Sequence, residues 1–388
     1  MKVAINLSDF KSYQDTLLML NHIAQKVEKL YILTNQWEEF PQSIEKSSHL
    51  EIIAFPKARF RTLATEWLFE HCLSVPIEDR IDIVHDFFGH LCRFFEEAKM
   101  MKDRRFRTLN TQRTSNTAWF ELVRPLGFEL DQSYVQQRII SLWRDLRLFK
   151  QADHIVVLGP GHDQEIISHY GVPNHHVSWF PSEIDLRKFL PDFESAIEAK
   201  VVLYTGRIFR NKGLEDAFAV MFALKDQIPD LKFVLIGEVP FFERKWFEAQ
   251  IRESRNIGLD VVHLLHMPRE NLIRYYQTSG VYLFPSLFEG SPRSVREAIA
   301  CGLPAVLSDI PGHRGIDPNG GFVRFFPVRD REEMKRQVLL QIEENVFDLE
   351  GRRQRAHRGV DWLMNNHHPE RVADRYLRLY RELLAREI

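Results

Sequence analysis

The 388-residue chain has little cysteine and no long apolar run. Its three cysteines, Cys72, Cys92 and Cys301, have neither the number nor the spacing of a disulfide framework or a zinc site, which predicts free thiols in a reducing compartment. No stretch reaches the roughly 20 apolar residues of a membrane span. The N-terminus turns polar after Leu7 and does not resemble a signal peptide. With a formal net charge of -2, which gives no case for nucleic-acid binding, these absences predict a cytoplasmic globular protein.

The sequence also lacks several catalytic signatures. It contains no P-loop, no G-x-G-x-x-G and no G-x-S-x-G, which argues against a kinase, a dehydrogenase and an α/β-hydrolase. It has no D-x-D pattern and no H-E-x-x-H, and the scattered histidines do not have metal-ligand spacing. We therefore expect no bound metal.

What the chain does contain is two blocks of strands alternating with helical segments. The length exceeds what one core usually supports, so two domains are expected. Alternation of this kind predicts a parallel, doubly wound sheet in each block. Gly and Pro residues between Val172 and Pro191 indicate the linker. We predict domains at 1–185 and 186–365, with residues 366–388 as a C-terminal helix whose apolar side needs a partner.

Ligands of doubly wound sheets bind at the carboxyl ends of the strands. In the second block those ends carry Gly206–Arg207, Gly237–Glu238, His266–Met267 and the loop Ser286–Gly290. The candidate site is therefore expected along this edge.

The segment from Phe284 to Pro304 reads as a strand end, a loop and a short helix. Ser291 is a good N-cap and would place free backbone N–H groups at a site for phosphate. Glu289 precedes the helix and Glu297 lies within it, so two carboxylates would flank one anion site and could accept hydrogen bonds from sugar hydroxyls. The alternative makes Glu289 a dipole-compensating acid and Glu297 a solvated helix residue.

A second cationic segment, Gly206 to Gly213, follows the first strand of the same block. Arg207 offers a fork for phosphate oxygens and Lys212 a point charge. Taken alone, it also fits a cation-rich surface turn. Its expected position at the same sheet edge favours phosphate binding.

Two basic and apolar stretches in the first block could contact anionic lipid. They are Lys57–Leu73 and Lys99–Arg107. The alternative is an ordinary solvated helix face with a core side.

Together these motifs resemble the retaining glycosyltransferases of family 4, which have the GT-B fold. Glu289 and Glu297, with Gly302–Pro304, resemble the family's E-x7-E motif, and Gly206–Arg207 with Lys212–Gly213 resembles its donor-diphosphate motif. The resemblance is clearest over about residues 145–310. It implies an α/β protein with two Rossmann-like domains facing a central cleft, and a C-terminal helix that crosses back to the N-terminal domain.

The resemblance also implies residue roles. Arg207 and Lys212 would hold the donor diphosphate, Glu289 the donor sugar and Glu297 the ribose. Backbone N–H groups of Gly290 and Ser291 would assist, Gly206 would permit the turn, and His266–Met267 would lie beside the base. The N-terminal domain would bind the acceptor.

Three segments depart from the family pattern. Ser8–Lys11 replaces the glycine-rich loop, Thr111–Arg113 replaces a T-x-H, and Pro181–Asp185 replaces the usual P-N-G-V-D. On the acceptor side the candidates for catalysis are His85 and Arg113.

The expected function is a retaining, metal-independent glycosyltransferase without a cofactor. It would transfer a hexosyl or N-acetylhexosaminyl group from a nucleotide diphosphate sugar, such as a UDP-sugar, to a glycan, a lipid-linked or a small-molecule acceptor. It would be cytoplasmic and could contact the inner face of a membrane; the oligomeric state is open. The alternatives are an epimerase or hydrolase of the same fold, or an inactive protein that binds nucleotide sugars.

Overall fold

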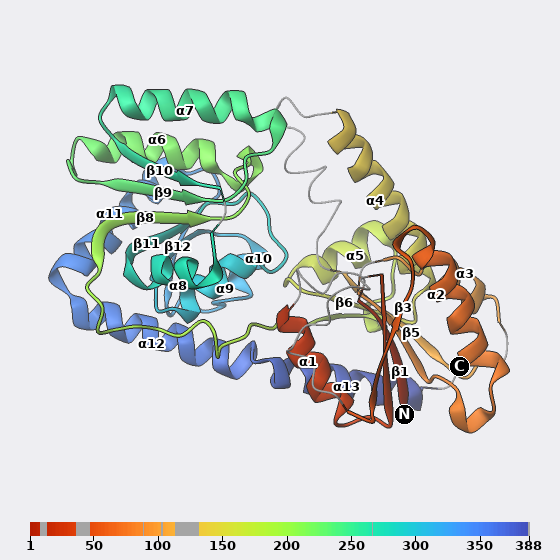
Figure 1. The fold of residues 1–388 in the computed structure, drawn as a ribbon. Coiled ribbons are helices and arrows are strands. Elements are labelled where there is room, and N and C mark those ends of the chain that lie inside the picture. Colours follow the sequence, from red (N-terminus) through yellow and green to blue (C-terminus); the bar gives the residue numbers. More distant parts are fainter. Residues whose placement is uncertain are drawn as a thin grey trace. The chain divides into compact units, whose positions relative to one another are not determined.

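The computed structural model describes the chain except residues 8–13, 36–46, 88, 102–103, 113–131, 266 and 387–388. The described chain forms two compact units (Figure 1). Of the described residues, the first comprises those within 1–112, 136–185 and 366–386, and the second comprises 132–135 and those within 186–365.

The first unit contains a seven-stranded sheet in which every paired strand is parallel. The order places β1 and β4 side by side in the middle, as in Rossmann-like sheets. In sheet order the strands are β3 (Leu50–Ala54), β2 (Lys29–Thr34), β1 (Lys2–Asn6), β4 (Ile83–Asp86), β5 (Arg107–Gln112), β6 (His154–Val157) and β7 (Val177–Trp179).

Helices cover both faces of this sheet. Alternation along β1 sends Val3 and Ile5 to one face and Ala4 to the other, so each face has its own apolar cluster. On the Val3 face lie α1 (Gln14–Ala24) and α13 (Pro369–Ala385). The opposite face is covered by α2 (Phe60–Phe69), α3 (Cys92–Lys99), α4 (Gln132–Gln151) and α5 (His162–Tyr170).

The C-terminal helix α13 completes the core of the first unit. Its apolar stripe, which includes Val372, Tyr376 and Tyr380, is buried in one core cluster with residues of α1 and the sheet. Figure 1 shows α13 running beside α1. At the helix surface, the carboxylate of Asp374 lies 2.9 Å from Lys26 Nζ of the chain segment after α1. The prediction that the final helix returns to the N-terminal domain is therefore confirmed, and its unpartnered stripe was the signal.

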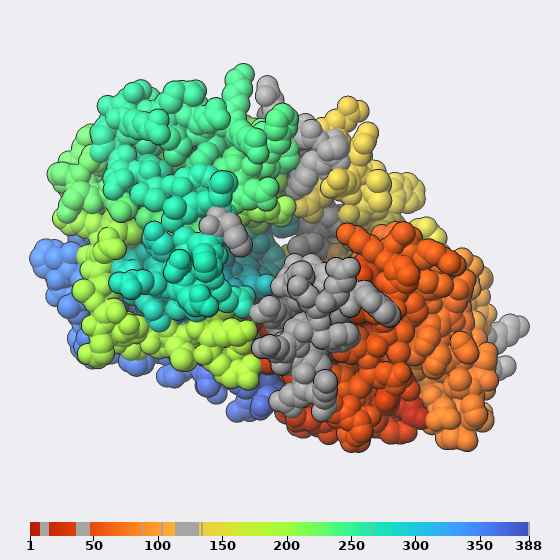
Figure 2. Space-filling model, in the orientation of Figure 1, coloured from red at the N-terminus to blue at the C-terminus, as the bar shows by residue number. Residues whose placement is uncertain are grey.

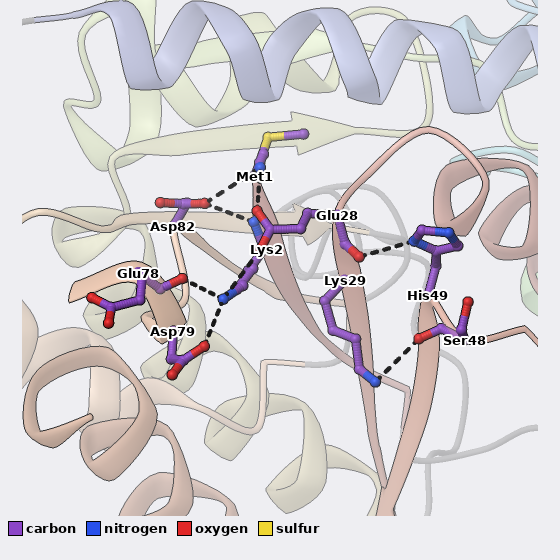
Figure 3. A network of polar contacts seen from close by, with 9 residues as sticks. All are labelled: Met1, Lys2, Glu28, Lys29, Ser48, His49, Glu78, Asp79 and Asp82. Carbon is purple, nitrogen blue, oxygen red and sulfur yellow. Dashed lines mark hydrogen bonds and ion pairs between the residues drawn. The ribbon is translucent and has the colours of Figure 1, made fainter. Parts of the chain in front are cut away.

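A network of polar contacts lies at the amino ends of the strands of the first sheet (Figure 3). Lys2 Nζ lies 3.1 Å from Asp79 Oδ1 and 3.2 Å from Glu28 Oε1, and the Lys2 N–H donates to Asp82. Burial by itself would lower the pKa of the Lys2 ammonium, but the hydrogen bonds that it donates to Asp79 and Glu28, together with their charges, raise this pKa overall. Because this network faces away from the carboxyl edge, we interpret it as structural.

The second unit contains a six-stranded sheet, again with all paired strands parallel. In sheet order the strands are β10 (Asp260–Leu264), β9 (Lys232–Ile236), β8 (Glu198–Thr205), β11 (Ser279–Phe284), β12 (Ala305–Ser308) and β13 (Val323–Phe326). Its helices are α6 (Leu214–Lys225), α7 (Arg244–Asn256), α8 (Arg269–Thr278), α9 (Arg293–Ala300), α10 (Pro311–Arg314), α11 (Arg331–Phe347) and α12 (Leu349–Asn366).

The prediction of two doubly wound α/β domains is thus confirmed, while two edge strands were missed. β7 falls inside the predicted linker, and its three residues are too few to show a period. β13 has only four residues and directly follows Gly320, Gly321 and Phe322, and a glycine pair is more typical of a turn than of a strand. Among the described residues, no helix is long and apolar enough to cross a bilayer.

Candidate active site

The cationic loop Arg210–Gly213 is held at the carboxyl end of β8 by close backbone packing. Gly213 has a φ of +71°, and a Cβ atom there would lie 1.9 Å from the carbonyl oxygen of Pro285. The N–H of Leu287 donates to the carbonyl of Asn211 at 3.1 Å. The loop after β8 therefore packs directly on the loop after β11, as the placement of both segments on one edge predicts.

A buried ion pair fixes the start of the same loop. Glu243 is fully buried, and its carboxylate lies 2.9 Å from Arg210 Nε. Burial raises the pKa of Glu243, and the neighbouring guanidinium opposes that shift. Removing one partner of such a pair usually costs about 3–5 kcal/mol, so Arg210 is a structural support for the lysine that follows.

Lys212 and Glu289 form the central contact of the site. Lys212 Nζ lies 2.5 Å from Glu289 Oε1, and the two side chains are 18% and 14% exposed. Ser286 Oγ also donates to Glu289 Oε1 at 3.0 Å, and Ser308 Oγ donates to the Ser286 carbonyl at 2.5 Å. The carboxylate and the ammonium, 77 residues apart in the chain, are thus fixed in one small polar cluster.

The helix after this loop starts later than predicted. Helix α9 begins at Arg293, and its cap position is Pro292, without a side-chain cap. The prediction that Ser291 is the N-cap is wrong, because Ser291 Oγ instead accepts a hydrogen bond from Arg296 of the same helix. Gly290 is buried beside it.

Glu297 is buried among aromatic hydroxyls and is not a solvated helix residue. It is 6% exposed, and Tyr276 OH donates to its Oε2 at 3.1 Å. Thr205 Oγ1 lies 2.8 Å from Tyr276 OH and 3.0 Å from Tyr282 OH. This hydroxyl network joins the end of β8 to α9, and sequence reasoning missed it because tyrosine is an ordinary core residue.

Two buried tyrosines, Tyr204 and Tyr282, lie close enough to the charged groups of the candidate site for those charges to shift their pKa values. Burial, with the nearby Glu297 and Glu289, raises the pKa of Tyr282. Burial raises the pKa of Tyr204. The charge of Glu289 raises this pKa further, and the charge of Arg207 lowers it. Tyr204 OH donates to the Arg207 carbonyl at 2.8 Å, while the Arg207 side chain is exposed. Arg207, Lys212, Glu289 and Glu297 therefore all lie near the carboxyl edge of the second sheet.

His313 is a further polar group in this cluster. It is fully buried, and its Nδ1 lies 2.7 Å from the Ser308 carbonyl, so Nδ1 carries the proton and donates. Burial lowers its pKa to about 4, so the ring is neutral at pH 7. Within the described chain its Nε2 has no hydrogen-bond partner. The preceding Gly312 packs so closely on Glu289 that a Cβ atom would lie 2.1 Å from the Glu289 carbonyl.

Of the two residues predicted beside the base, His266 lies outside the described residues. Met267 lines a cavity of about 570 Å³ beneath α8. The same cavity reaches Glu198, Lys232 and Ser279, which begin their strands at the opposite edge of the sheet. We therefore do not assign this cavity to the nucleotide.

In the first unit, His85 has the contacts of a core residue. It is fully buried, with Nδ1 at 2.7 Å from Tyr380 OH and Nε2 at 2.7 Å from Thr111 Oγ1. Its predicted catalytic role stays a prediction. Arg113, the other acceptor-side candidate, lies outside the described residues.

Sequence reasoning missed a buried polar cluster at the carboxyl edge of the first sheet. Asn6 Nδ2 donates to Asp86 Oδ1 at 2.7 Å, and Asn110 Nδ2 donates to the Asp86 carbonyl at 2.9 Å. Their positions at the ends of β1, β4 and β5 were the available signal. Over the residues that the structure describes, no three His, Cys, Asp or Glu side chains gather as metal ligands.

The packing of Gly213 makes a testable prediction. We expect Gly213→Ala to lower the free energy of unfolding by about 3 kcal/mol or more, because the methyl group meets the Pro285 backbone and the left-handed conformation disfavours alanine. Gly258→Ala is the matched control: it has the same φ of +71° but only Lys225 Cε, at 4.0 Å, near its added atom. We expect Gly258→Ala to lower the free energy of unfolding by about 1 kcal/mol. Equal losses in urea unfolding would contradict the packing argument.

Comparisons with known proteins find similarity to glycosyltransferases. A family model described as glycosyl transferases group 1 matches residues 187–358. A D-inositol 3-phosphate glycosyltransferase from Arthrobacter is 26% identical over 43% of this chain and 42% of its own length. An N,N'-diacetylbacillosaminyl-diphospho-undecaprenol alpha-1,3-N-acetylgalactosaminyltransferase from Campylobacter jejuni is 27% identical over 67% of this chain and 69% of its own length.

Solved structures with the same fold cover nearly the whole chain. Sucrose-phosphate synthase from Thermosynechococcus elongatus superimposes with a TM-score of 0.72 at 19% identity, covering 99% of both chains. HepE from Anabaena, in complex with UDP and glucose, superimposes with a TM-score of 0.69 at 12% identity. The match covers 98% of this chain and 99% of HepE. The fold is therefore that of GT-B proteins, and residues 187–358 are similar to the glycosyl transferases group 1 family.

Proposed function

We propose that this protein is a retaining glycosyltransferase that uses a UDP-sugar. The observation that carries the proposal is the contact between Lys212 and Glu289 at the carboxyl end of the second sheet. The ammonium can bind the anionic end of a ligand. The carboxylate, which already accepts a hydrogen bond from Ser286, can accept further ones from hydroxyl groups at the other end of that ligand. A nucleotide diphosphate sugar has both ends.

In this scheme Lys212 leaves Glu289 for the donor diphosphate, and exposed Arg207 binds the same group. The released carboxylate of Glu289 accepts hydrogen bonds from the sugar, and Glu297 accepts them from the ribose. Backbone N–H groups of Gly290 and Ser291 assist the diphosphate.

Charge stabilisation would supply most of the catalysis. The acceptor hydroxyl attacks the anomeric carbon as its bond to the diphosphate oxygen breaks, and the departing phosphate takes the hydroxyl proton. Arg207 and Lys212 offset the charge that develops on the leaving group, so these fixed cations can serve without a metal ion or other cofactor. A leaving group that also takes the proton must remain on the attacked face, which is why we propose retention.

Support for the acceptor and donor classes comes from the comparisons. The name of the Campylobacter jejuni relative specifies transfer to a diphospho-undecaprenol acceptor, and the HepE structure contains UDP and glucose. We propose a lipid-linked acceptor and a hexosyl or N-acetylhexosaminyl donor for this chain.

The first test is binding of UDP to the purified protein. UDP should raise the melting temperature, since a ligand at a hundredfold excess over its dissociation constant stabilises by about 2.7 kcal/mol. UMP, which lacks the second phosphate, should give a smaller shift. No shift with any nucleoside diphosphate would contradict the proposal.

Turnover then separates transfer from the alternatives. Release of UDP from a UDP-sugar should require a lipid-linked sugar acceptor, and NMR of the product should show the donor's anomeric configuration. Sugar release without an acceptor would instead indicate a hydrolase, and inversion would overturn the retaining mechanism.

A further inference from the structure

A cavity of the first unit lies between α13 and the end of the edge strand β7. Its volume is about 310 Å³, and its lining consists of Ser178, Phe180, Arg375, Arg378, Leu379 and Glu382. This volume is at the lower end of the range for small-molecule sites. It corresponds to about ten water molecules at their share of the liquid volume, which is more space than one inorganic anion fills.

One stripe of α13 forms most of this cavity. Its three other helical residues follow Arg375 at spacings of three, four and seven positions, which places all four on one side of a helix. Leu379 is buried, and the ring of Phe180 packs edge to face on Tyr376 at a centroid distance of 4.9 Å. Figure 2 looks onto red and orange residues of the first unit; the dark blue of α13 does not appear among them, and the cavity belongs to a part of the surface that this view does not show.

The two arginines of the cavity are not neutralised. Within the part of the chain that the structure describes, neither the Arg375 nor the Arg378 guanidinium has an ion pair or a hydrogen bond. Burial lowers the pKa of Arg375, and the charge of Arg378 lowers it further. The carboxylate of the preceding residue, Asp374, instead lies 2.9 Å from Lys26 Nζ and 3.1 Å from His22 Nε2. Two like charges are thus held near each other, and a bound anion would compensate them.

Ser178 adds a hydrogen-bonding group to the lining. Its Oγ lies 2.9 Å from His154 Nε2. A hydroxyl has one donor and two acceptor positions, so Ser178 can bind a ligand as well as His154. Burial, together with the charges of Arg386 and the neighbouring histidines, lowers the pKa of His154 to about 3, so the ring is neutral at pH 7. Arg386 therefore contributes a further permanent positive charge to the surroundings of the cavity.

One carboxylate also lines the cavity, and it restricts the choice of ligand. Glu382 is exposed and lies one turn after Arg378, but within the described chain it forms no ion pair with either arginine. A carboxylate repels an anionic group and accepts hydrogen bonds from hydroxyl groups. The lining therefore favours a ligand that is anionic near the two arginines and hydroxylated near Glu382.

We propose that this cavity binds a phosphate monoester that carries hydroxyl groups, such as a polyol phosphate. Arg375 and Arg378 bind the phosphate oxygens, and Ser178 and Glu382 bind the hydroxyl groups. A phosphate monoester carries about −1.5 to −2 charges at pH 7 and so matches two guanidinium groups, whereas a carboxylate supplies only one charge. Because α13 completes the core of the first unit, a ligand that holds this helix to β7 stabilises that unit. The proposal does not depend on the proposed sugar transfer.

The test is equilibrium dialysis of the full-length protein against radiolabelled glycerol 3-phosphate. The compound should bind, and unlabelled glycerol should not displace it. Arg375→Gln and Arg378→Gln should each raise the dissociation constant at least about tenfold, because each removes hydrogen bonds from a charged group. Arg381→Gln is the matched control: it makes the same substitution at an exposed position of α13 outside the cavity, and it should leave the dissociation constant unchanged.

Circular dichroism should show the three variants folded, because glutamine keeps part of the apolar stem of arginine. No binding of glycerol 3-phosphate, or equal binding by wild type and Arg375→Gln, would overturn the proposal. So would binding that is lost in Lys212→Ala and kept in Arg375→Gln, since the phosphate would then occupy the cationic loop of the second unit. UDP binding is measured without glycerol 3-phosphate, so failure of either proposal is recognised separately.

Discussion

Lys212→Ala is expected to lower kcat for UDP release by about 10²–10³-fold, the usual loss when one preorganised charge at a leaving group is removed. In the structure Lys212 Nζ lies 2.5 Å from Glu289, which places the ammonium at the candidate site. The UDP-induced shift in melting temperature should fall in parallel, because ground-state binding of the diphosphate uses the same ammonium. A coupled assay of UDP release with a lipid-linked acceptor measures the first effect.

The control removes the same charge outside the site. Lys245 is exposed on α7, and Lys245→Ala should leave both kcat and the UDP shift unchanged. Glu289→Gln keeps the shape of the side chain but removes its charge, and it should lower kcat while leaving UDP binding largely intact. Full turnover by Lys212→Ala would remove the main support for the proposed function.

Tyr380→Ala should strongly destabilise the first unit. Tyr380 is fully buried on α13, and its hydroxyl lies 2.7 Å from His85 Nδ1. Truncating a buried aromatic residue costs about 3–5 kcal/mol through lost packing and the cavity left behind. The imidazole of His85 also loses a hydrogen-bond partner. Urea unfolding followed by circular dichroism measures the change.

Two further variants separate packing from hydrogen bonding at this position. Tyr380→Phe keeps the ring and should cost only about 1 kcal/mol. Arg381→Ala changes the exposed neighbour on the same helix and should stay within about 0.5 kcal/mol. If Tyr380→Ala matched Arg381→Ala, α13 would not contribute to the core of the first unit as described.

The sequence predicted the candidate site best where chemically distinctive residues follow the ends of predicted parallel strands. Each of Lys212 and Glu289 follows a strand by a few residues, and parallel strands end at a common edge, so their meeting could be predicted without coordinates. The unpartnered stripe of α13 likewise required an apolar surface, and the core of the first unit supplies it.

Other features depend on packing that no local pattern encodes. Tyr276, Tyr282 and His313 look like ordinary core residues in the sequence, and only the fold turns their polar atoms toward the candidate site. Ser291 had the right chemistry for an N-cap, but Arg296, one turn later on the helix, binds its hydroxyl instead. The sequence around His85 likewise gave no sign that its two ring nitrogens lie beside the hydroxyls of Tyr380 and Thr111.

The return of α13 to the first unit has a consequence for biosynthesis. The core beside β1 stays open until α13 has left the ribosome, whereas residues 186–365 can fold before that. A stop codon placed before Pro369 would therefore yield a polypeptide with an intact second unit and an incomplete first one, a substrate for chaperones and proteases.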